Sequence, residues 1–581
     1  MMLWHLGNTT VRTPYRLRDG LIAIKNSSFN GNLSGRIVEG EFAKYLDSIG
    51  LLSASRISSG ANIDDLGRKW RSAFTKLGFL THKFSKRLNP SGLDDKLLLF
   101  VDEIDELSGR PYEITPNGYR LINSDVITAQ QECFLRSLVS YRIPSLLEGR
   151  YACEQFSPLH FVLEIMHCLS MKAEDSRLFF NEFCFFVQTS SPDSGIDNII
   201  SNILNFRKNR LEASGNIKQF DRDALDKIVL EHDYARETFN DYADVSFRYL
   251  KATGLFKTVG RSIVFSQSHW QLISLLREQY VPNIPEVEYF RNLWLGAALP
   301  TDDFTSSYRV VIDLVKQLND RGVPTEEPSI ATAQVDLEVL RHQLEDKLLK
   351  LDEREFAEAQ AEKIQEIGQW LSALETGKPK NSNQFLDDEV IKFNKSEAPV
   401  YLEWVVWRAF LAINSLKNEP WEARRFQIDQ DFFPINCAPG GGPDMIFELE
   451  QFVVVVEVTL TQSSRQEAAE GEPVRRHVAD YTLKYADKPV YGLFIAVDID
   501  SNTAHTFLRG DWYKKDDTKI NLDIVPITLS AFCKFFLSSE GRLSEMPRIL
   551  REMLIECRAK ANLDAPLWKK SISTIVESKI K

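Results

Sequence analysis

The sequence has 581 residues, of which 43% are hydrophobic and 26% are charged, so its length and composition predict several compact domains of an ordinary globular protein. Its net charge of −12 argues against a uniformly basic surface for binding nucleic acid. The seven cysteines are never spaced as CxxC, and no HExxH, GxxxxGK[ST] or strand-linked GxGxxG pattern occurs, which argues against zinc hydrolysis, P-loop ATPase activity and dinucleotide binding.

The first residues, MMLWHLGNTTVR, lack the basic and apolar regions of a secretion signal. The most apolar run of the chain, FVVVVEV, is far too short to cross a bilayer. Together with the scattered cysteines, these features predict a cytoplasmic protein that has no membrane partner.

Residues 1–150 form the first predicted domain. Two helices are expected, EGEFAKYLDSI and IDDLGRKWRSAFTKLGFL, followed by a basic loop, a short strand and the segment EITPNGYRLI. This order is typical of a winged-helix module, in which one helix enters the major groove of DNA. Trp70, Phe74 and Leu77 of the second helix are expected to face inward.

The basic residues of this domain lie between Asp65 and Asp94, a window without any acidic residue. The predicted DNA-binding residues are Arg68, Lys69, Arg71, Lys76, Lys83, Lys86 and Arg87. Their positive charges would neutralise phosphates of the DNA backbone. The alternative interpretation is a basic helix face that contacts only solvent.

Residues 151–282 form a second, similar predicted domain. Helices are expected at PLHFVLEIMHCL and DSRLFFNEFCFFV, and the later helical segment YADVSFRYLKATGLF leads into the hairpin KTVGRSIVFS, with Gly260 at its turn. Residues 283–395 are predicted to be a helical linker. Its apolar stripe, with leucines spaced by three or four from Leu337 to Leu351, favours a helix packed on its neighbours over a coiled coil, because few heptads are covered.

Residues 396–581 contain the candidate chemistry. The segment PVYLEWVVWRAFLAINSL is expected to be a helix in which Glu403 shares a face with Val406, Trp407 and Phe410. Because burial of an unpaired carboxylate is costly, this acid needs a nearby cation or hydrogen-bond network. The alternative is that Glu403 lies in the first turn, where the helix dipole favours an acid.

The next segment, APGGGPDMIFELEQFVVVVEVT, predicts a glycine-rich turn and two antiparallel strands. A turn centred on Glu450 and Gln451 would place Asp444 directly opposite Glu457. Opposed residues have Cβ atoms about 4.5 to 5.5 Å apart, where two carboxylates repel each other unless a cation lies between them. Oxygen ligands in this arrangement suit Mg²⁺, which can activate a bound water and stabilise charge on a phosphorus centre.

Pro-Asp followed by Glu on the next strand is the pattern of the PD-(D/E)xK nuclease superfamily, which normally has a lysine two residues after the glutamate. Thr459 occupies that position here. A candidate replacement is the turn that contains Glu472, Arg475, Arg476 and His477, predicted to begin a helix with Pro473 just inside it. Arginines could bind the scissile phosphate, and His477 or Glu472 could assist deprotonation of water. The alternative is a solvated capping turn.

The sequence resembles the AlwI-type family of type IIS restriction endonucleases, which includes the large subunits of related nicking endonucleases. The resemblance rests on FLRSLVSYRIPS, FSPLHFVLEIM, RYLKATGLF, YLEWVVWRAF, GGGPDMIFE, VVEVT and EGEPVRRH. It implies winged-helix-like recognition subdomains, a helical linker and a C-terminal α/β nuclease domain of the PD-(D/E)xK type, hence a multidomain α+β protein of a prokaryotic cytoplasm. Its catalytic acids would be Glu403, Asp444, Glu457 and Glu472, and the family also lacks the lysine.

The resemblance implies a Mg²⁺-dependent enzyme that recognises a short asymmetric site in double-stranded DNA and cuts a few bases outside it. One nuclease domain cuts one strand, so cleavage of both strands would need a transient homodimer or a separate small nuclease subunit. Two alternatives remain open: a non-catalytic DNA-binding protein with a degenerate nuclease domain, and a nuclease specific for branched DNA or for RNA.

Overall fold

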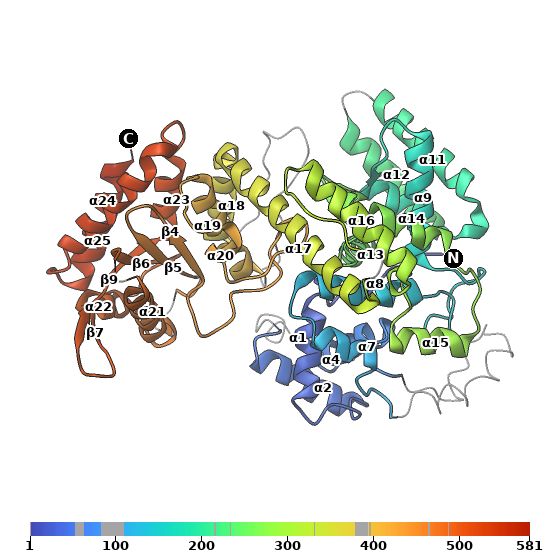
Figure 1. Cartoon of the computed structure of the whole chain (residues 1–581), viewed down its shortest axis with the longest axis horizontal. Helices are drawn as coiled ribbons and strands as arrows, with labels where there is room; N and C mark the ends of the chain where they lie inside the picture. Colours follow the sequence, from blue (N-terminus) through green and yellow to red (C-terminus); the bar gives the residue numbers. More distant parts are fainter. Residues whose placement is uncertain are drawn as a thin grey trace. The chain divides into compact units, whose positions relative to one another are not determined.

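A computed structural model of the chain shows a mixed α+β protein that is mostly helical and has small sheets (Figure 1). It divides into two compact units, residues 1–348 and 349–581. No helix in the described part of the chain is both long and apolar enough to cross a membrane. The structure describes residues 2–52, 63–82, 110–213, 216–232, 234–329, 332–377, 393, 397–462, 465–485 and 487–580.

The first unit contains the elements of both predicted recognition domains. Its first part has the helices α1 (Arg16–Lys25), α2 (Arg36–Ser48), α4 (Ile63–Lys76), α7 (Pro116–Ile122), α8 (Ile127–Ser140) and α9 (Pro158–Lys172). Its middle part has β1 (Leu178–Phe179), α10 (Phe180–Glu182), the π-helix η1 (Phe183–Val187), η2 (Pro192–Ser194), α11 (Ile196–Glu212), α12 (Ile217–His232), α13 (Arg236–Lys251), β2 (Phe256–Val259) and β3 (Ser262–Phe265). Its last part has η3 (Gln267–His269), α14 (Trp270–Glu278), α15 (Glu286–Leu295), η4 (Pro300–Asp302), α16 (Phe304–Asp320) and most of α17 (Gln334–Ala359).

The two helices predicted after residue 39 are α2 and α4, which pack closely on each other. Gly67 makes this approach possible, because a Cβ atom there would lie 1.9 Å from the carbonyl oxygen of Glu39. Trp70, Phe74 and Leu77 face the interior, as predicted from the spacing of these apolar residues.

The second predicted helix of the 151–282 region needs a correction. The segment that starts at Asp175 forms strand β1 and then a short helical turn and a π-helix, instead of one continuous helix. The reason is that Leu178 pairs with Ile263 of β3, which adds a third strand to the predicted hairpin. The hairpin itself is confirmed, with β2 and β3 antiparallel and Gly260 at positive φ in the turn.

The predicted linker, residues 283–395, is divided between the two units. Helices α15 and α16 pack within the first unit, α15 on α7 and α8, and α16 on α14. Of the predicted leucine stripe, Leu337, Leu344 and Leu348 are buried, as expected for an amphipathic helix packed on its neighbours. Whether residues 1–150 and 151–282 act as separate domains stays a prediction.

The second unit contains a four-stranded sheet covered by helices (Figure 1). Its elements are η5 (Gln360–Glu362), α18 (Ile364–Thr376), α19 (Ala398–Ala412), α20 (Pro420–Ala423), β4 (Met445–Glu448), β5 (Val453–Thr459), α21 (Arg465–Lys484), β6 (Val490–Ala496), α22 (Ser501–Arg509), β7 (Asp511–Tyr513), β8 (Lys519–Asn521), β9 (Asp523–Thr528), α23 (Leu529–Leu537), η6 (Leu543–Glu545), α24 (Met546–Ala559) and α25 (Ala565–Lys579).

The sheet has the order β4-β5-β6-β9, in which β4 and β5 are antiparallel and the other neighbours are parallel. The β5 run VVVVEVT is almost entirely apolar because helices cover both faces of the sheet. On one face, Phe410 of α19 stacks on Phe447 of β4, with ring centroids 4.0 Å apart. On the other face, Phe507 of α22 contacts Phe494 of β6.

The predicted start of the helix after β5 is wrong. Helix α21 begins at Arg465, and Pro473 lies inside it instead of in its first turn. A proline in a helix interior removes one backbone donor, but it does not end this helix, because Val474, Val478 and Ala479 bury their side chains in the core of the unit.

Candidate active site

Asp444 and Glu457 lie at the same end of the β4-β5 hairpin. Met445 pairs with Val456, so the next pair along the ladder places Asp444 opposite Glu457, as the position of the turn predicts. The backbone N–H of Val458 donates to Oδ2 of Asp444 at 2.9 Å. This bond fixes the Asp444 carboxylate beside the strand that carries Glu457.

Glu403 joins these two acids from helix α19. Its side chain is buried, and its Oε2 atom accepts a hydrogen bond from the backbone N–H of Ala438 at 2.7 Å. Ala438 begins the glycine-rich segment that leads into Asp444, so this bond ties the helix to the turn before β4. The network that an acid on an apolar helix face requires is therefore present.

The electrostatics of the site are unfavourable without a cation. Burial and the negative charge of Asp444 raise the pKa of Glu403 to about 8. Burial and the charge of Glu470 raise the pKa of Glu457 to about 8. Burial and Glu457 raise the pKa of Asp444 well above its usual value. Each acid thus disfavours ionisation of its neighbour. Such destabilising groups of carboxylates are typical of functional sites.

His477 of α21 contacts Glu457 directly. Its Nδ1 atom lies 2.5 Å from Oε1 of Glu457, while its Nε2 atom is buried and has no hydrogen-bond partner among the described residues. Burial, followed by the charges of Arg476 and Arg425, lowers the pKa of His477. The lowered pKa favours the neutral imidazole, and Nδ1 shares one proton with the Glu457 carboxyl group.

Glu470, which no sequence motif indicated, lies with these acids. Its charge raises the pKa values of Asp444 and Glu457, and its own side chain is hydrogen-bonded to Thr459. Glu470 and His477 are seven residues apart, which places them on one face of α21, toward β5. The sequence does contain an indication of this, because an acid seven residues, or about two helical turns, before His477 lies on the same helix face.

Glu472, the predicted fourth acid, points elsewhere. Its side chain is 61% exposed and pairs with Arg476 at 3.1 Å. Arg475 of the same turn donates to the carbonyl of Asp511 and lies over the Trp512 ring. In this conformation the Glu472 side chain contacts solvent and Arg476, as expected for a solvated turn, and does not lie with the other acids. A catalytic role for Glu472 stays a prediction.

Arg425, which no sequence motif indicated either, is a cation close to the acids. Its guanidinium donates to the carbonyl oxygen of Pro443 at 3.2 Å, and its charge opposes the rise in the pKa of Glu403. Thr459, at the usual lysine position, uses its hydroxyl to contact Thr461 and Glu470.

The donor set fits a hard divalent cation such as Mg²⁺, because Glu403, Asp444 and Glu457 offer only carboxylate oxygens. A bound cation would also remove the repulsion that raises their pKa values. Among the described residues, three ligand atoms within 4.8 Å of one another are found only in the first unit, so these acids are gathered more loosely. Asp444 and Glu457 nevertheless share a side-chain hydrogen bond.

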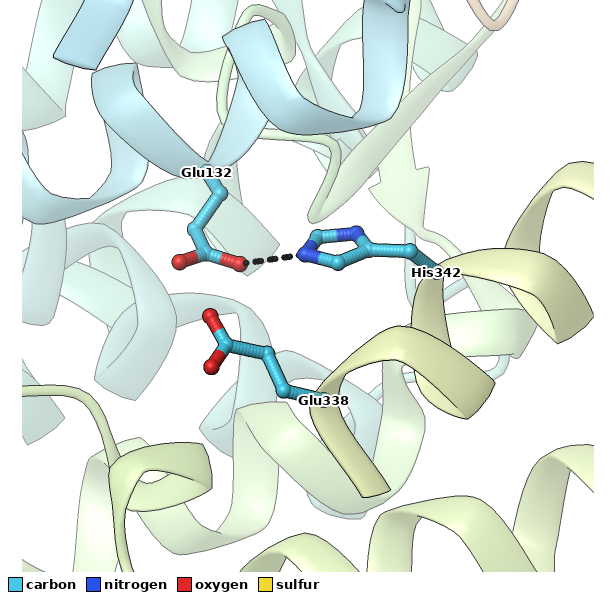
Figure 2. A group of neighbouring side chains, drawn as sticks. All are labelled: Glu132, Glu338 and His342. Atoms are coloured by element: carbon cyan, nitrogen blue, oxygen red, sulfur yellow. Dashed lines mark ion pairs between the residues drawn. The ribbon is translucent and has the colours of Figure 1, made fainter. Parts of the chain in front are cut away.

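The tighter group consists of Glu132 of α8 and of Glu338 and His342 of α17, both in the first unit (Figure 2). Glu132 already accepts hydrogen bonds from Arg136 at 2.7 Å and from Arg341 at 2.5 Å. Two guanidinium groups neutralise this carboxylate, which leaves little attraction for a metal ion. The group is therefore an ion-pair network that holds α17 against α8.

The predicted DNA-binding residues occupy different environments. The side chains of Arg68 and Lys69 on α4 are 53% and 37% exposed, and both pair with Asp65. Arg71 pairs with Glu39 at 2.7 Å. Lys76 does not fit the prediction of a DNA contact, because its ammonium is buried between Glu148 and the carbonyl of His5. The predicted residues Lys83, Lys86 and Arg87 lie outside the described residues.

Comparisons with known proteins give three findings. Residues 75–535 match the family model described as AlwI restriction endonuclease. The solved small subunit of the heterodimeric restriction endonuclease R.BspD6I is 25% identical, with all of that chain and 37% of this one covered and a TM-score of 0.28. The restriction endonuclease FokI is 11% identical, with 96% of that chain and 92% of this one covered and a TM-score of 0.20. Both TM-scores are too low to establish a shared arrangement, and no curated protein matches the chain.

Proposed function

The chain belongs to the AlwI restriction endonuclease family, and from this premise we propose that it is a type IIS restriction or strand-nicking endonuclease that requires Mg²⁺. It recognises a short asymmetric site in double-stranded DNA and hydrolyses a phosphodiester a few bases outside that site. The convergence of Glu403 from α19, Asp444 from the turn before β4 and Glu457 from β5 is the observation that carries the proposal.

The side chains of the site divide into two roles, metal binding by the acids and positioning and proton acceptance by His477. Asp444 and Glu457, with Glu403 beside them, would hold Mg²⁺, which when bound lowers the pKa of a water molecule and stabilises negative charge on the phosphate. His477 holds the Glu457 carboxylate in place through its Nδ1–H and keeps its other nitrogen available as a proton acceptor. On this proposal, the site is a PD-(D/E)xK site that lacks the usual lysine.

The fourth acid is Glu472 or Glu470. The family resemblance favours Glu472, but the side chain of Glu470 is the one that lies with the other acids. We expect Glu470→Gln to lower the cleavage rate more than Glu472→Gln does. A larger loss in Glu472→Gln would restore the assignment made from the sequence.

Sequence recognition belongs to the first unit, whose predicted winged-helix-like modules lie at 1–150 and 151–282. Arg68 and Lys69 remain candidates for phosphate contacts, because surface ion pairs such as theirs with Asp65 are worth only about 0 to 1 kcal/mol and can be exchanged for DNA. We do not include Lys76, whose ammonium is buried. One acidic site per chain cuts one strand, so double-strand cleavage needs a transient homodimer or a small nuclease subunit.

The test is incubation of the purified full chain with plasmid DNA, with Mg²⁺ or with EDTA. We expect Mg²⁺-dependent nicked or linear products, cut at a fixed offset from one short sequence. Asp444→Asn and Glu457→Gln should abolish cleavage and keep sequence-specific binding in Ca²⁺, whereas Asp516→Asn, in the exposed β7-β8 turn, should cleave normally.

Specific binding without cleavage under any divalent ion would favour the non-catalytic alternative. Cleavage of branched DNA or RNA regardless of sequence would favour the other nuclease class. Undiminished cleavage by Asp444→Asn would remove the assigned site.

A further inference from the structure

The acidic site lacks a cation at the position where related nucleases have a lysine. Thr459 occupies that position and bonds to Thr461 and Glu470. A phosphodiester that approaches Asp444 and Glu457 brings its own negative charge to a site that is already acidic. A basic side chain with unused donors is therefore expected close to these acids.

Arg425 is placed on the correct side of the sheet for this role. Arg424 forms a bridge with Met445 along the free edge of β4, so the chain runs beside β4 in extended form at this point. Successive side chains of an extended segment point to opposite faces. Arg424 pairs with Glu353 on one face, so Arg425 lies on the other, where its charge contributes to the lowered pKa of His477 and opposes the rise that burial causes in the pKa of Tyr481, both on α21.

The guanidinium of Arg425 has donors to spare. It gives one hydrogen bond to the carbonyl oxygen of Pro443, directly before Asp444, and forms no ion pair with a carboxylate among the described residues. The backbone N–H of Arg425 also donates to the carbonyl of Asp444 at 3.3 Å. The side chain is half-buried, so it is held in place and still reaches solvent.

Gly442 makes room for this guanidinium. A Cβ atom at position 442 would lie 2.4 Å from a terminal nitrogen of Arg425. The glycine-rich turn before Asp444 thus positions the catalytic acid and the arginine together.

We infer that Arg425 binds a non-bridging oxygen of the scissile phosphate and supplies the positive charge that a lysine at position 459 would otherwise supply. This inference rests on the proposed function. Arginine is suited to the task because its planar guanidinium presents several donors to a phosphate and stays charged at all working pH values.

The experiment measures single-turnover cleavage in Mg²⁺ and DNA affinity in Ca²⁺ for the full chain. We expect Arg425→Gln to lower the cleavage rate by about 100-fold or more, the usual effect of removing one donor to a developing negative charge, with affinity changed less than about 3-fold. Arg425→Lys should recover part of the rate. Arg548→Gln, an exposed arginine on α24, is the control and should cleave normally.

Two further variants separate this role from a structural one. Gly442→Ala keeps every charge but displaces the guanidinium, and we expect roughly a 10-fold loss of rate with unchanged thermal unfolding. With a neutral methylphosphonate at the mapped cleavage position, the wild type should bind more weakly than it binds phosphate, and Arg425→Gln should discriminate less between the two than the wild type does.

The outcomes are distinct. If the wild type does not cleave, the proposed function fails. If the wild type cleaves and Arg425→Gln cleaves at the same rate, the inference about Arg425 is overturned. Discrimination against methylphosphonate that is as strong in Arg425→Gln as in the wild type would also overturn it.

Discussion

Replacing Glu403 with glutamine removes one negative charge from the acidic site and keeps nearly the same shape. The carbonyl oxygen of the amide can still accept the hydrogen bond from Ala438. We therefore expect Glu403→Gln to abolish cleavage and, at the same time, to stabilise the metal-free protein. The second effect follows from the raised pKa of Glu403 and can be calculated.

The pKa of Glu403 rises from 4.5 in a free side chain to about 8 in the fold. Because the folded value is the higher one, the acid contributes its stability below pH 4.5 and loses it as the pH rises through 8. One pKa unit corresponds to about 1.36 kcal/mol, so the penalty for ionised Glu403 is at most ~5 kcal/mol at high pH. Sharing of protons with Asp444 reduces this figure, and we expect a net gain of ~2 kcal/mol in Glu403→Gln at pH 8.

The assay is pulse proteolysis of the full chain in urea with EDTA present. It follows the unfolding of residues 349–581 separately from that of the first unit. The variant should resist higher urea than the wild type at pH 8, and the two should converge toward pH 5. Added Ca²⁺ should stabilise the wild type more than the variant. An equal difference at both pH values, or a variant that is less stable at pH 8, would refute the electrostatic reasoning.

Three further predictions concern the first unit. Gly67→Ala forces a Cβ against the Glu39 carbonyl, so we expect a loss of ~1 to 3 kcal/mol in urea unfolding and weaker DNA binding; unchanged stability would show that α2 and α4 can separate without loss. Glu286 is buried, one of its oxygens has no hydrogen-bond partner among the residues that the structure describes, and burial raises its pKa to about 7. Glu286→Gln should therefore raise the unfolding temperature at pH 8 but not at pH 4.5, and a gain at both would contradict this. Glu132→Ala leaves two buried arginines without their shared partner and should cost ~3 to 5 kcal/mol in thermal or urea unfolding, and a loss below 1 kcal/mol would mean that their other acids suffice.

The sequence was most informative where local chemistry decides the structure. The β-branched run of β5 and the turn at Glu450 set the register of the hairpin, and the facing positions of Asp444 and Glu457 followed from it. Glu403 was found for a similar reason, because an acid on an apolar helix face requires partners.

The sequence was least informative about where a helix begins and which way single side chains point. Pro473 suggested a helix start, but α21 begins earlier because its apolar face is buried. Residues two apart on a helix point about 200° from each other, so Glu470 faces the site where Glu472 faces solvent. Arg425 reaches the site through a bridge between Arg424 and Met445, which no local pattern indicates. Lys76 is buried by Glu148, which is distant in sequence.

The order of the two units along the chain has a consequence for synthesis in the cell. The ribosome completes residues 1–348 before it adds Glu403, Asp444 or Glu457. At usual rates of about 5 to 20 residues per second, the acids follow on the order of ten seconds later. On the proposed division of roles, the DNA-recognition unit is synthesised before the nuclease unit. A chain whose synthesis stops early therefore never has the nuclease unit without the recognition unit.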